Sequence, residues 1–513
     1  MTMTAQVSQP EELRPDRWIA MFVLLMAQFM NLIDVTIVNV AMPSLQKAFN
    51  ATSSQIEWVV AAYILVFALG LLPLGRLGDI LGRPRMFMAG VGVFTLGSLL
   101  CGLATSMPFL ISARLLQGAG GAMMVPQTLA IAQVLFPPRE RAMAFSLFGL
   151  TAGLASVTGP VLGGLLIDLD IWGLEWRPIF LVNIPVGAIA VAGALRFIPR
   201  MPGSAEMKND YLGILLASLT VMLLIFPLIE GRELGWPVWA FVMMAASLPA
   251  AAVFVFWQRR QQGRGGPQLL PFALLANRNF LIGTAMTTIL FAGIPGFFLV
   301  LALYLQNGNG LTPLQSGLTT MPFSIGVLCA SVVSGRLGMR WPRRRITAGA
   351  LFLAGAMVWL HFVVAGLEPP LDRLVFAAPL LAGGLGLGVA IAPMFQTVLS
   401  NVPPRDAGSG SGALQSFQQV GGAFGVALMG QLFFSTLALG IQSGLPAHAA
   451  YGEGLVRALY FNTVGFVLIA IMWTNNPISD LVYGSMQHLP EALGVPLRAI
   501  AEGWREFDSV LHG

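Results

Sequence analysis

Long apolar segments, separated by short polar stretches, follow one another along almost the whole chain. About 20 apolar residues cross the hydrocarbon core of a bilayer as an α-helix, and lipid offers no partner for the open backbone groups of other structures. The apolar residues also do not alternate with polar ones, as barrel strands would require. The pattern predicts an all-α polytopic membrane protein with fourteen transmembrane helices, placed near 18–42, 56–75, 86–104, 108–134, 142–167, 177–198, 212–230, 237–257, 281–305, 314–335, 346–366, 373–398, 409–438 and 457–475.

Basic residues recur in the polar stretches and do not form one patch, which argues against a nucleic-acid partner. Of the 28 Lys and Arg residues, Arg114 lies inside a span and 22 fall in one alternating set of stretches together with the C-terminal tail. The opposite set holds Lys47, Arg177, Arg232, Arg373 and Arg457. Because basic loops stay inside, this asymmetry predicts a multi-pass membrane protein with both termini in the cytoplasm.

The composition supports a membrane location. Hydrophobic residues make up 56% of the 513 residues and charged residues only 10%, whereas soluble domains carry about a quarter charged residues. The two cysteines, Cys101 and Cys329, lie far apart in apolar segments, so we expect core packing and neither a disulfide nor a metal site.

The chain repeats itself at an interval of about half its length. The run Gly-Arg-Leu-Gly at 75–78 returns at 335–338, and Pro-Pro-Arg-Glu at 137–140 returns as Pro-Pro-Arg-Asp at 403–406. Like elements in like order predict two homologous halves, an architecture of secondary transporters that place the substrate between the halves. The predicted domains are a six-helix bundle at 1–200, an inserted helix pair at 201–265, a second six-helix bundle at 266–476 and an amphipathic cytoplasmic tail at 477–513.

Two charged residues lie within the predicted spans and are candidates for proton coupling. Asp34 shares one helix face with Gln28 and Asn31, so it should face the bundle interior or a cavity. A carboxyl whose proton affinity changes with water access can carry a proton, although a fixed hydrogen-bonding role is the alternative. Arg114 could regulate this carboxylate; otherwise it would snorkel to the outer boundary.

A glycine-rich stretch at 75–85 is a candidate cytoplasmic gate. Asp79 could cap a neighbouring helix or pair with Arg83, and the alternative is a solvated loop that only sets topology. The gating residues proposed are Gly75, Gly78, Asp79, Gly82 and Arg83. Small residues of the fifth span, which permit close helix packing or gating, are Gly153, Gly159, Pro160, Gly163 and Gly164. Candidate cavity-lining residues are Asn31, Tyr63, Gln117, Gln127, Gln396 and Phe417.

These segments together resemble the major facilitator superfamily. Residues 75–85 are similar to its loop between helices two and three, 114–121 to its fourth-helix motif and 153–164 to its antiporter motif. Residues 32–43 and 176–187 resemble the first and sixth helices of the fourteen-helix drug:proton antiporters. The resemblance implies a proton-coupled role for Arg114, efflux of hydrophobic, often cationic compounds and, in some members, a periplasmic adaptor with an outer-membrane channel. The short predicted outer loop at 439–456 argues against that partnership.

The leading hypothesis is a secondary active antiporter that exports toxic organic compounds by alternating access. It needs no cofactor because the proton gradient drives it, and no nucleotide-binding loop is present. A dedicated exporter of one metabolite, amino acid or siderophore is the second hypothesis. A non-transporting sensor or an intramembrane enzyme is the third, although no histidine pairs by sequence with a nucleophile as an enzyme would require.

Overall fold

The computed structural model describes residues 16–170, 173–204, 208–338, 340–366, 371–400 and 402–474. The amphipathic tail predicted at 477–513 lies outside these residues. The described part is all-helical, which confirms the predicted fold class.

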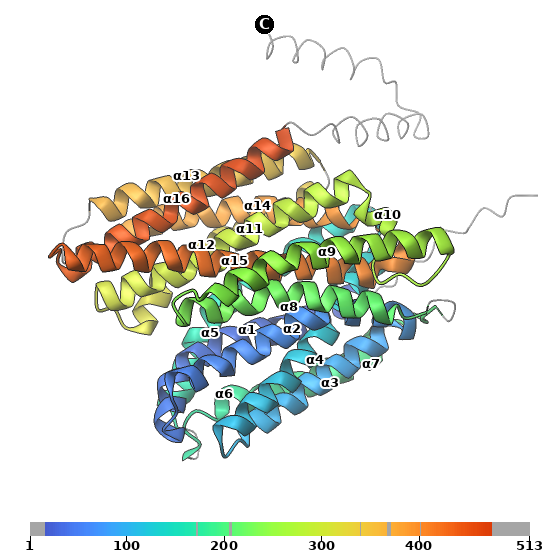
Figure 1. Cartoon of the computed structure of the whole chain (residues 1–513), viewed down its shortest axis with the longest axis horizontal. Coiled ribbons are helices and arrows are strands. Elements are labelled where there is room, and N and C mark those ends of the chain that lie inside the picture. Colours follow the sequence, from blue (N-terminus) through green and yellow to red (C-terminus); the bar gives the residue numbers. More distant parts are fainter. Residues whose placement is uncertain are drawn as a thin grey trace, which may run out of the picture.

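Long helices occupy the positions of the predicted spans (Figure 1). The first group is α1 (Arg17–Phe49), α2 (Ser53–Leu81), α3 (Arg83–Gly102), α4 (Met107–Leu135), α5 (Pro138–Asp168), α6 (Pro178–Leu181) and α7 (Asn183–Phe197). Next come α8 (Tyr211–Glu233), α9 (Val238–Arg264) and the short α10 (Phe272–Leu275). The last group is α11 (Arg278–Leu303), η2 (Tyr304–Gly308), α12 (Pro313–Leu337), α13 (Pro342–Ala365), η3 (Arg373–Phe376), α14 (Ala377–Leu399), η4 (Pro404–Asp406), α15 (Ala407–Gln442) and α16 (Ala447–Thr474).

Within the described residues, 12 helices are long and apolar enough to cross a membrane. Helices α4 and α5, with 29 and 31 residues, are long enough to cross a membrane, but their described residues are less apolar than those of the 12 helices. Helix α4 is mostly buried in protein, so it can carry glutamines and an arginine where a lipid-facing helix could not. The structure thus shows about twelve spans, and the count of fourteen stays a prediction.

The sixth predicted span, 177–198, corresponds to one continuous apolar segment, Pro178–Phe197, in which Val182 joins α6 to α7 with helical backbone angles. One predicted boundary was wrong. The last span begins at Ala447, ten residues before the predicted start, so most of the predicted loop at 439–456 is helical. Only residues 443–446 connect α15 to α16, since both helices continue beyond the apolar core that the hydropathy pattern detects.

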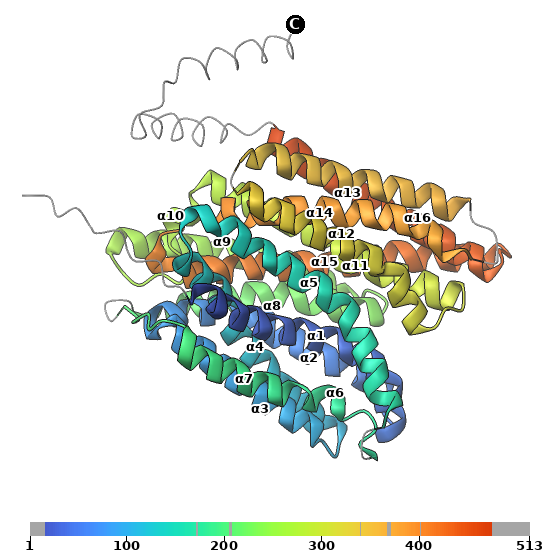
Figure 2. The same ribbon diagram turned by 180° about the vertical axis from the view of Figure 1, so that it is seen from behind.

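The two groups of helices, which we call the N-half (α1–α7) and the C-half (α11–α16), lie side by side. Helix α2 packs against α15, and α5 packs against α12 and α14. Helices α8 and α9 pair with each other, and α8 also contacts both α2 and α15. The ribbons of the two halves lie close at one end and diverge at the other (Figures 1 and 2). We call the close end, which carries Arg76, Arg83 and Arg405, the basic end.

The internal repeat extends to the way in which helices begin. Thr52 caps α2 by accepting from the Gln55 backbone N–H, while the Gln55 side chain accepts from the Thr52 N–H. Thr312 and Gln315 form the same reciprocal capping box at the start of α12. Each box satisfies two of the backbone donors left open at a helix start. Equivalent second helices in the two halves are therefore built alike.

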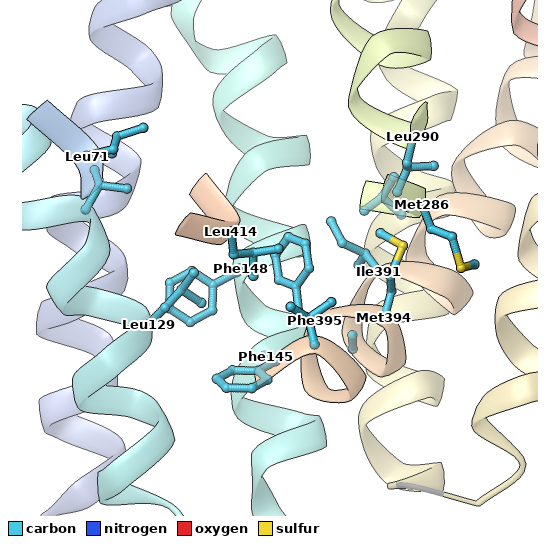
Figure 3. Close-up of a cluster of buried hydrophobic side chains, with 14 of the residues drawn as sticks. Leu71, Leu129, Phe145, Phe148, Met286, Leu290, Ile391, Met394, Phe395 and Leu414 are labelled. Carbon is cyan, nitrogen blue, oxygen red and sulfur yellow. The ribbon is translucent and has the colours of Figure 1, made fainter. Parts of the chain in front are cut away.

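Apolar side chains meet between the halves close to the basic end (Figure 3). Phe145 and Phe148 of α5 belong to the same buried cluster as Ile391 and Phe395 of α14. The other labelled members are Leu71, Leu129, Met286, Leu290, Met394 and Leu414. The cluster fills the space between the halves on the turns next to the basic end.

Small residues of α5 allow it to pack closely on α1. A Cβ atom at Gly159 would lie 1.9 Å from Thr36 Oγ1, and one at Gly163 would lie 2.8 Å from Ile37 Cγ1. Gly153 instead faces Val327 of α12 at an ordinary contact distance of 3.6 Å. A Cβ atom at Gly164 would meet no atom of another element within 4 Å, so close packing does not require glycine there. The side chain of Pro160 lies outside the described residues.

We predict that Gly159→Ala destabilises the protein by about 1–3 kcal/mol, because the added methyl group overpacks the contact with Thr36. The thermal unfolding midpoint of the detergent-purified protein should fall. Gly164→Ala, on the same helix, is the matched control and should leave the midpoint unchanged. Equal midpoints for the two variants would contradict close packing of α5 on α1.

Candidate functional site

The two charged residues predicted within the spans form an ion pair inside the N-half. Asp34 extends from the middle of α1 and Arg114 from the second turn of α4. Arg114 Nη1 donates to Asp34 Oδ2 at 2.5 Å, and both side chains are 0% exposed. Complete burial excludes the snorkelling role for Arg114. The structure therefore brings together the two residues that sequence reasoning singled out separately.

Amide side chains of α4 and α7 complete the coordination of this carboxylate. Gln117 Nε2 donates to Asp34 Oδ1 at 2.7 Å, and Asn183 Nδ2 donates to the same oxygen at 3.2 Å. Both nitrogens also donate to Ser98 Oγ of α3, at 2.6 and 3.1 Å. We call Asp34, Arg114, Gln117, Ser98 and Asn183 the Asp34 network.

The guanidinium of Arg114 is enclosed by its own set of contacts. Its Nε donates to the Val59 carbonyl oxygen at 2.9 Å, and its Nη1 also donates to Gln117 Oε1 at 2.6 Å. The ring of Tyr63 lies 4.4 Å from the guanidinium carbon, within the range of a cation–π interaction. Asn31 donates to the Tyr63 hydroxyl. The guanidinium thus contacts α1, α2 and its own helix.

Three predicted cavity-lining residues take part in these contacts instead. Asn31, Tyr63 and Gln117 are at most 3% exposed, so none of them faces an open cavity in this structure. Gln127 donates to the Leu74 carbonyl oxygen at 3.1 Å. Of the remaining two, Gln396 on α14 is buried and Phe417 on α15 is partly exposed.

Desolvation of two charges is costly, and further hydrogen bonds to the lone pairs and protons of a buried ion pair offset part of this cost. Among the described residues, Arg114 Nη2 is buried without such a partner. Here Asp34 accepts from three N–H donors on α4 and α7. If Asp34 took up a proton, the charge of Arg114 would remain buried without its counter-ion. The protonation state of Asp34 and the arrangement around Arg114 are therefore coupled.

The second cluster joins the halves at the basic end. Asp79, at the end of α2, accepts from the backbone N–H groups of Gly408 and Ser409 at 2.8 and 2.9 Å and from Ser409 Oγ at 3.1 Å. It also accepts from Arg83 Nε at 2.9 Å, and Arg83 Nη2 donates to the Pro404 carbonyl oxygen. The carboxylate thus caps α15, where the helix dipole favours a negative charge. Both contacts predicted for Asp79 are present.

Further hydrogen bonds tie the same ends together. Arg76 Nη1 donates to Asp406 Oδ1 at 2.9 Å, and both side chains are buried. Gln133 Nε2 donates to the Leu399 carbonyl oxygen at 2.8 Å, and Ser411 Oγ donates to the Pro126 carbonyl oxygen at 2.7 Å. We call these contacts and those of Asp79 the basic-end latch.

Glycines permit the close approach that the latch requires. A Cβ atom at Gly75 would lie 2.5 Å from the Gly408 carbonyl oxygen, and one at Gly78 would overlap the Gln127 amide. Gly82 has φ 99°, a conformation that residues with side chains rarely adopt. All three glycines of the predicted gating motif therefore have a steric reason to be glycine.

Among the contacts that the structure describes, none in the C-half repeat corresponds to the Asp79 cap. The position that follows Gly338 holds Met339, where the N-half has Asp79 after Gly78. Arg345 donates instead to the carbonyl oxygens of Gly338 and Ser334, which belong to its own half. The seam between α5 and α12 is closely packed without that capping carboxylate, because Gly335 fits against Met143 and Ser146.

Sequence reasoning missed several members of these clusters. Asn183 lies in the sixth-span motif, and that motif was the available signal for it. Asp406 lies in the repeated Pro-Pro-Arg-Asp run, which gave no indication of its partner Arg76. No feature of the sequence singles out Ser98.

The two cysteines differ in their surroundings. Cys101 is buried near the Asp34 network, with its Sγ 3.6 Å from Gln117 Oε1. Cys329 is exposed and does not pack in the core as predicted.

The fold and the two clusters define a multi-pass helical membrane transporter with two similar halves. The sequence profile of the Major Facilitator Superfamily matches residues 24–426, and the chain belongs to that family. It is a transporter and not an enzyme.

Named relatives and solved structures agree with this assignment. A Streptomyces coelicolor protein named "Probable actinorhodin transporter" is 38% identical over 86% of this chain and 76% of its own length. The "Multidrug resistance protein Stp" of Mycobacterium tuberculosis is 33% identical over 82% and 76%. The crystal structure of the human organic anion transporter MFSD10 shares the fold, with a TM-score of 0.62 at 16% identity over 90% of this chain and 100% of that chain.

We predict that transport requires the basic-end latch to open. Cysteines introduced at Arg76 and Asp406, in a chain with Cys101 and Cys329 replaced by Ala, should be joined by a reducible thiol cross-linker, because the native side chains are 2.9 Å apart. Cross-linking should abolish substrate flux in proteoliposomes, and reduction should restore it.

The matched control joins Arg17 and Glu140, a 2.8 Å pair within the N-half. Cross-linking these positions should leave flux largely intact, because both belong to the same half. Undiminished flux with the Arg76 and Asp406 positions joined would show that the halves do not separate there.

Proposed function

We propose that the protein is a proton-coupled exporter of small organic compounds that works by alternating access. The supporting observation is the fully buried ion pair of Asp34 and Arg114. An ionisable group at membrane depth is costly and usually serves a transport pathway. Two relatives are named for transport of an antibiotic or for multidrug resistance, which supports export over import.

In the proposed cycle, Asp34 carries the proton and Arg114 acts as its modulator. The ionised carboxylate is satisfied by Arg114 and the two amides, and the network is closed to solvent. Protonation removes the counter-ion of Arg114 and thereby favours a different arrangement of α1 and α4. No cofactor takes part, because the proton gradient supplies the free energy.

We assign the basic end to the cytoplasm, following the excess of Lys and Arg in its connections. Both termini are then cytoplasmic, and the membrane is the bacterial inner membrane. The basic-end latch closes the cytoplasmic side in this state, with Asp79 capping α15 across the two halves. Separation of this cap from α15 would open the cytoplasmic side to substrate.

We propose that the chain belongs to the fourteen-helix drug:proton antiporters and that α8 and α9 are the inserted helix pair. An adaptor and an outer-membrane channel are not needed in this proposal. Residues 443–446 alone connect α15 to α16, so that connection offers no long segment for an adaptor to bind.

We predict that Asp34→Asn abolishes proton-driven transport. The variant keeps the shape of the side chain but cannot exchange a proton. Dye transport driven by a pH gradient in inverted membrane vesicles should fall to the level of vesicles without the protein.

Asp210→Asn is the matched control for this variant. Asp210 is a buried carboxylate as well, but it accepts from Trp257 and Gln258 of α9, outside both halves. It should retain gradient-driven transport. Retained transport in Asp34→Asn would remove Asp34 from the proposed mechanism.

A second candidate is a dedicated exporter of an uncharged metabolite, and one observation favours it. Among the described residues the buried carboxylates are Asp34, Asp79, Asp210 and Asp406, and each already accepts from a protein donor. A cationic substrate would have to take its counter-charge from one of these contacts. An uncharged substrate requires no such exchange.

Competition experiments can distinguish the two candidates. In the same vesicles, we expect uncharged polycyclic aromatic compounds to inhibit dye transport at concentrations about tenfold lower than quaternary ammonium compounds of similar size. A tenfold difference in affinity corresponds to roughly 1.4 kcal/mol of binding free energy. Stronger inhibition by the quaternary ammonium compounds would support export of cationic drugs. Inhibition by one compound only would indicate a dedicated exporter.

A further inference from the structure

Asn183 connects the carboxylate of Asp34 to the sixth span. It is the first residue of α7 and follows Val182, whose helical backbone joins α6 to α7. Its side chain is 3% exposed, and Nδ2 donates to Asp34 Oδ1 at 3.2 Å and to Ser98 Oγ at 3.1 Å. One amide thus joins α7 to both α1 and α3.

Its position differs from that of the other amide on the carboxylate. Gln117 extends from the same helix as Arg114, and its Oε1 accepts from Arg114 Nη1 at 2.6 Å. The orientation of Gln117 is therefore set by α4. Asn183 is the donor to Asp34 that comes from another helix, and its bond is the longest of the three. A small shift of α7 would change this bond first.

The charged and titratable groups that face Asp34 are few. Arg114 approaches from α4, Tyr63 from α2 and Cys101 from α3. Among the contacts that the structure describes for the Asp34 carboxylate, none comes from a titratable side chain of α5 or α7. A neutral donor such as Asn183 can therefore alter the balance between the ionised and protonated carboxyl without adding a charge.

We propose that Asn183 is a positioning residue for proton exchange at Asp34. Its N–H donation favours the ionised carboxylate, and the position of α7 sets the strength of that donation. Movement of the sixth span during the transport cycle then changes how readily Asp34 takes up a proton. The inference rests on the proposed function, because it assumes that Asp34 carries the proton.

The test uses Asn183→Leu, which keeps the branched shape and the number of side-chain heavy atoms and removes the donor. The midpoint for protonation of Asp34 should move upward by about one to two pH units, as expected for loss of one hydrogen bond to a charged group. The midpoint is read from the infrared carbonyl band of a protonated carboxyl that Asp34→Asn removes. This readout works in purified full-length protein even if the variant transports poorly. The pH profile of dye transport should shift in the same direction.

Asn462→Leu is the matched control. Asn462 is a fully buried asparagine on α16 whose Nδ2 donates to the Gly293 carbonyl oxygen, away from Asp34. Its loss should leave the Asp34 midpoint unchanged.

The outcomes separate the two proposals. If Asp34→Asn abolishes proton-driven transport but Asn183→Leu leaves the midpoint of the carboxyl band unchanged, the role of Asn183 is refuted and the proposed function stands. Transport that persists with its normal pH dependence in Asp34→Asn refutes the proposed function itself. An equal shift in Asn183→Leu and Asn462→Leu would show a general effect of losing a buried amide and would also refute the role of Asn183.

Discussion

A charge inside an apolar bundle needs a partner, and the N-half is organised around this requirement. Asp34 and Arg114 are both fully buried, so each supplies the counter-charge that the other needs. The remaining polar atoms draw in Gln117, Ser98 and Asn183 from α4, α3 and α7. One ion pair therefore fixes how these helices sit around α1.

The contact between the halves follows a different rule. Lipid chains are as apolar as leucine, so helices in a membrane gain little from hydrophobic burial and depend on close packing and hydrogen bonds. Glycines bring α2 and α15 together, and Asp79 then reaches the open N–H groups at the start of α15. These bonds lie at one end of the molecule, where they can break as a group. Close packing inside each half is spread along the helices instead.

Much of the fold could be predicted from the sequence, because hydropathy reports directly on contact with lipid. Long apolar segments located the helices, and the repeat at 75–78 and 335–338 indicated two similar halves. The helix ends were less accurate, since α1 and α16 continue past the apolar core into polar residues.

The sequence by itself determined which residues are out of place in an apolar span, and so it identified Asp34 and Arg114. Only the tertiary structure decided that they bind each other and that Asn183 and Ser98 complete their coordination. It also decided that Asp79 reaches α15. At the equivalent position of the other half, the sequence has Met339, which carries no carboxylate. The reason is physical: the free-energy cost of burying a charge depends on the residue and on the apolar stretch of sequence around it, and both can be read from the sequence. A hydrogen-bond partner depends on how separate helices are placed in space.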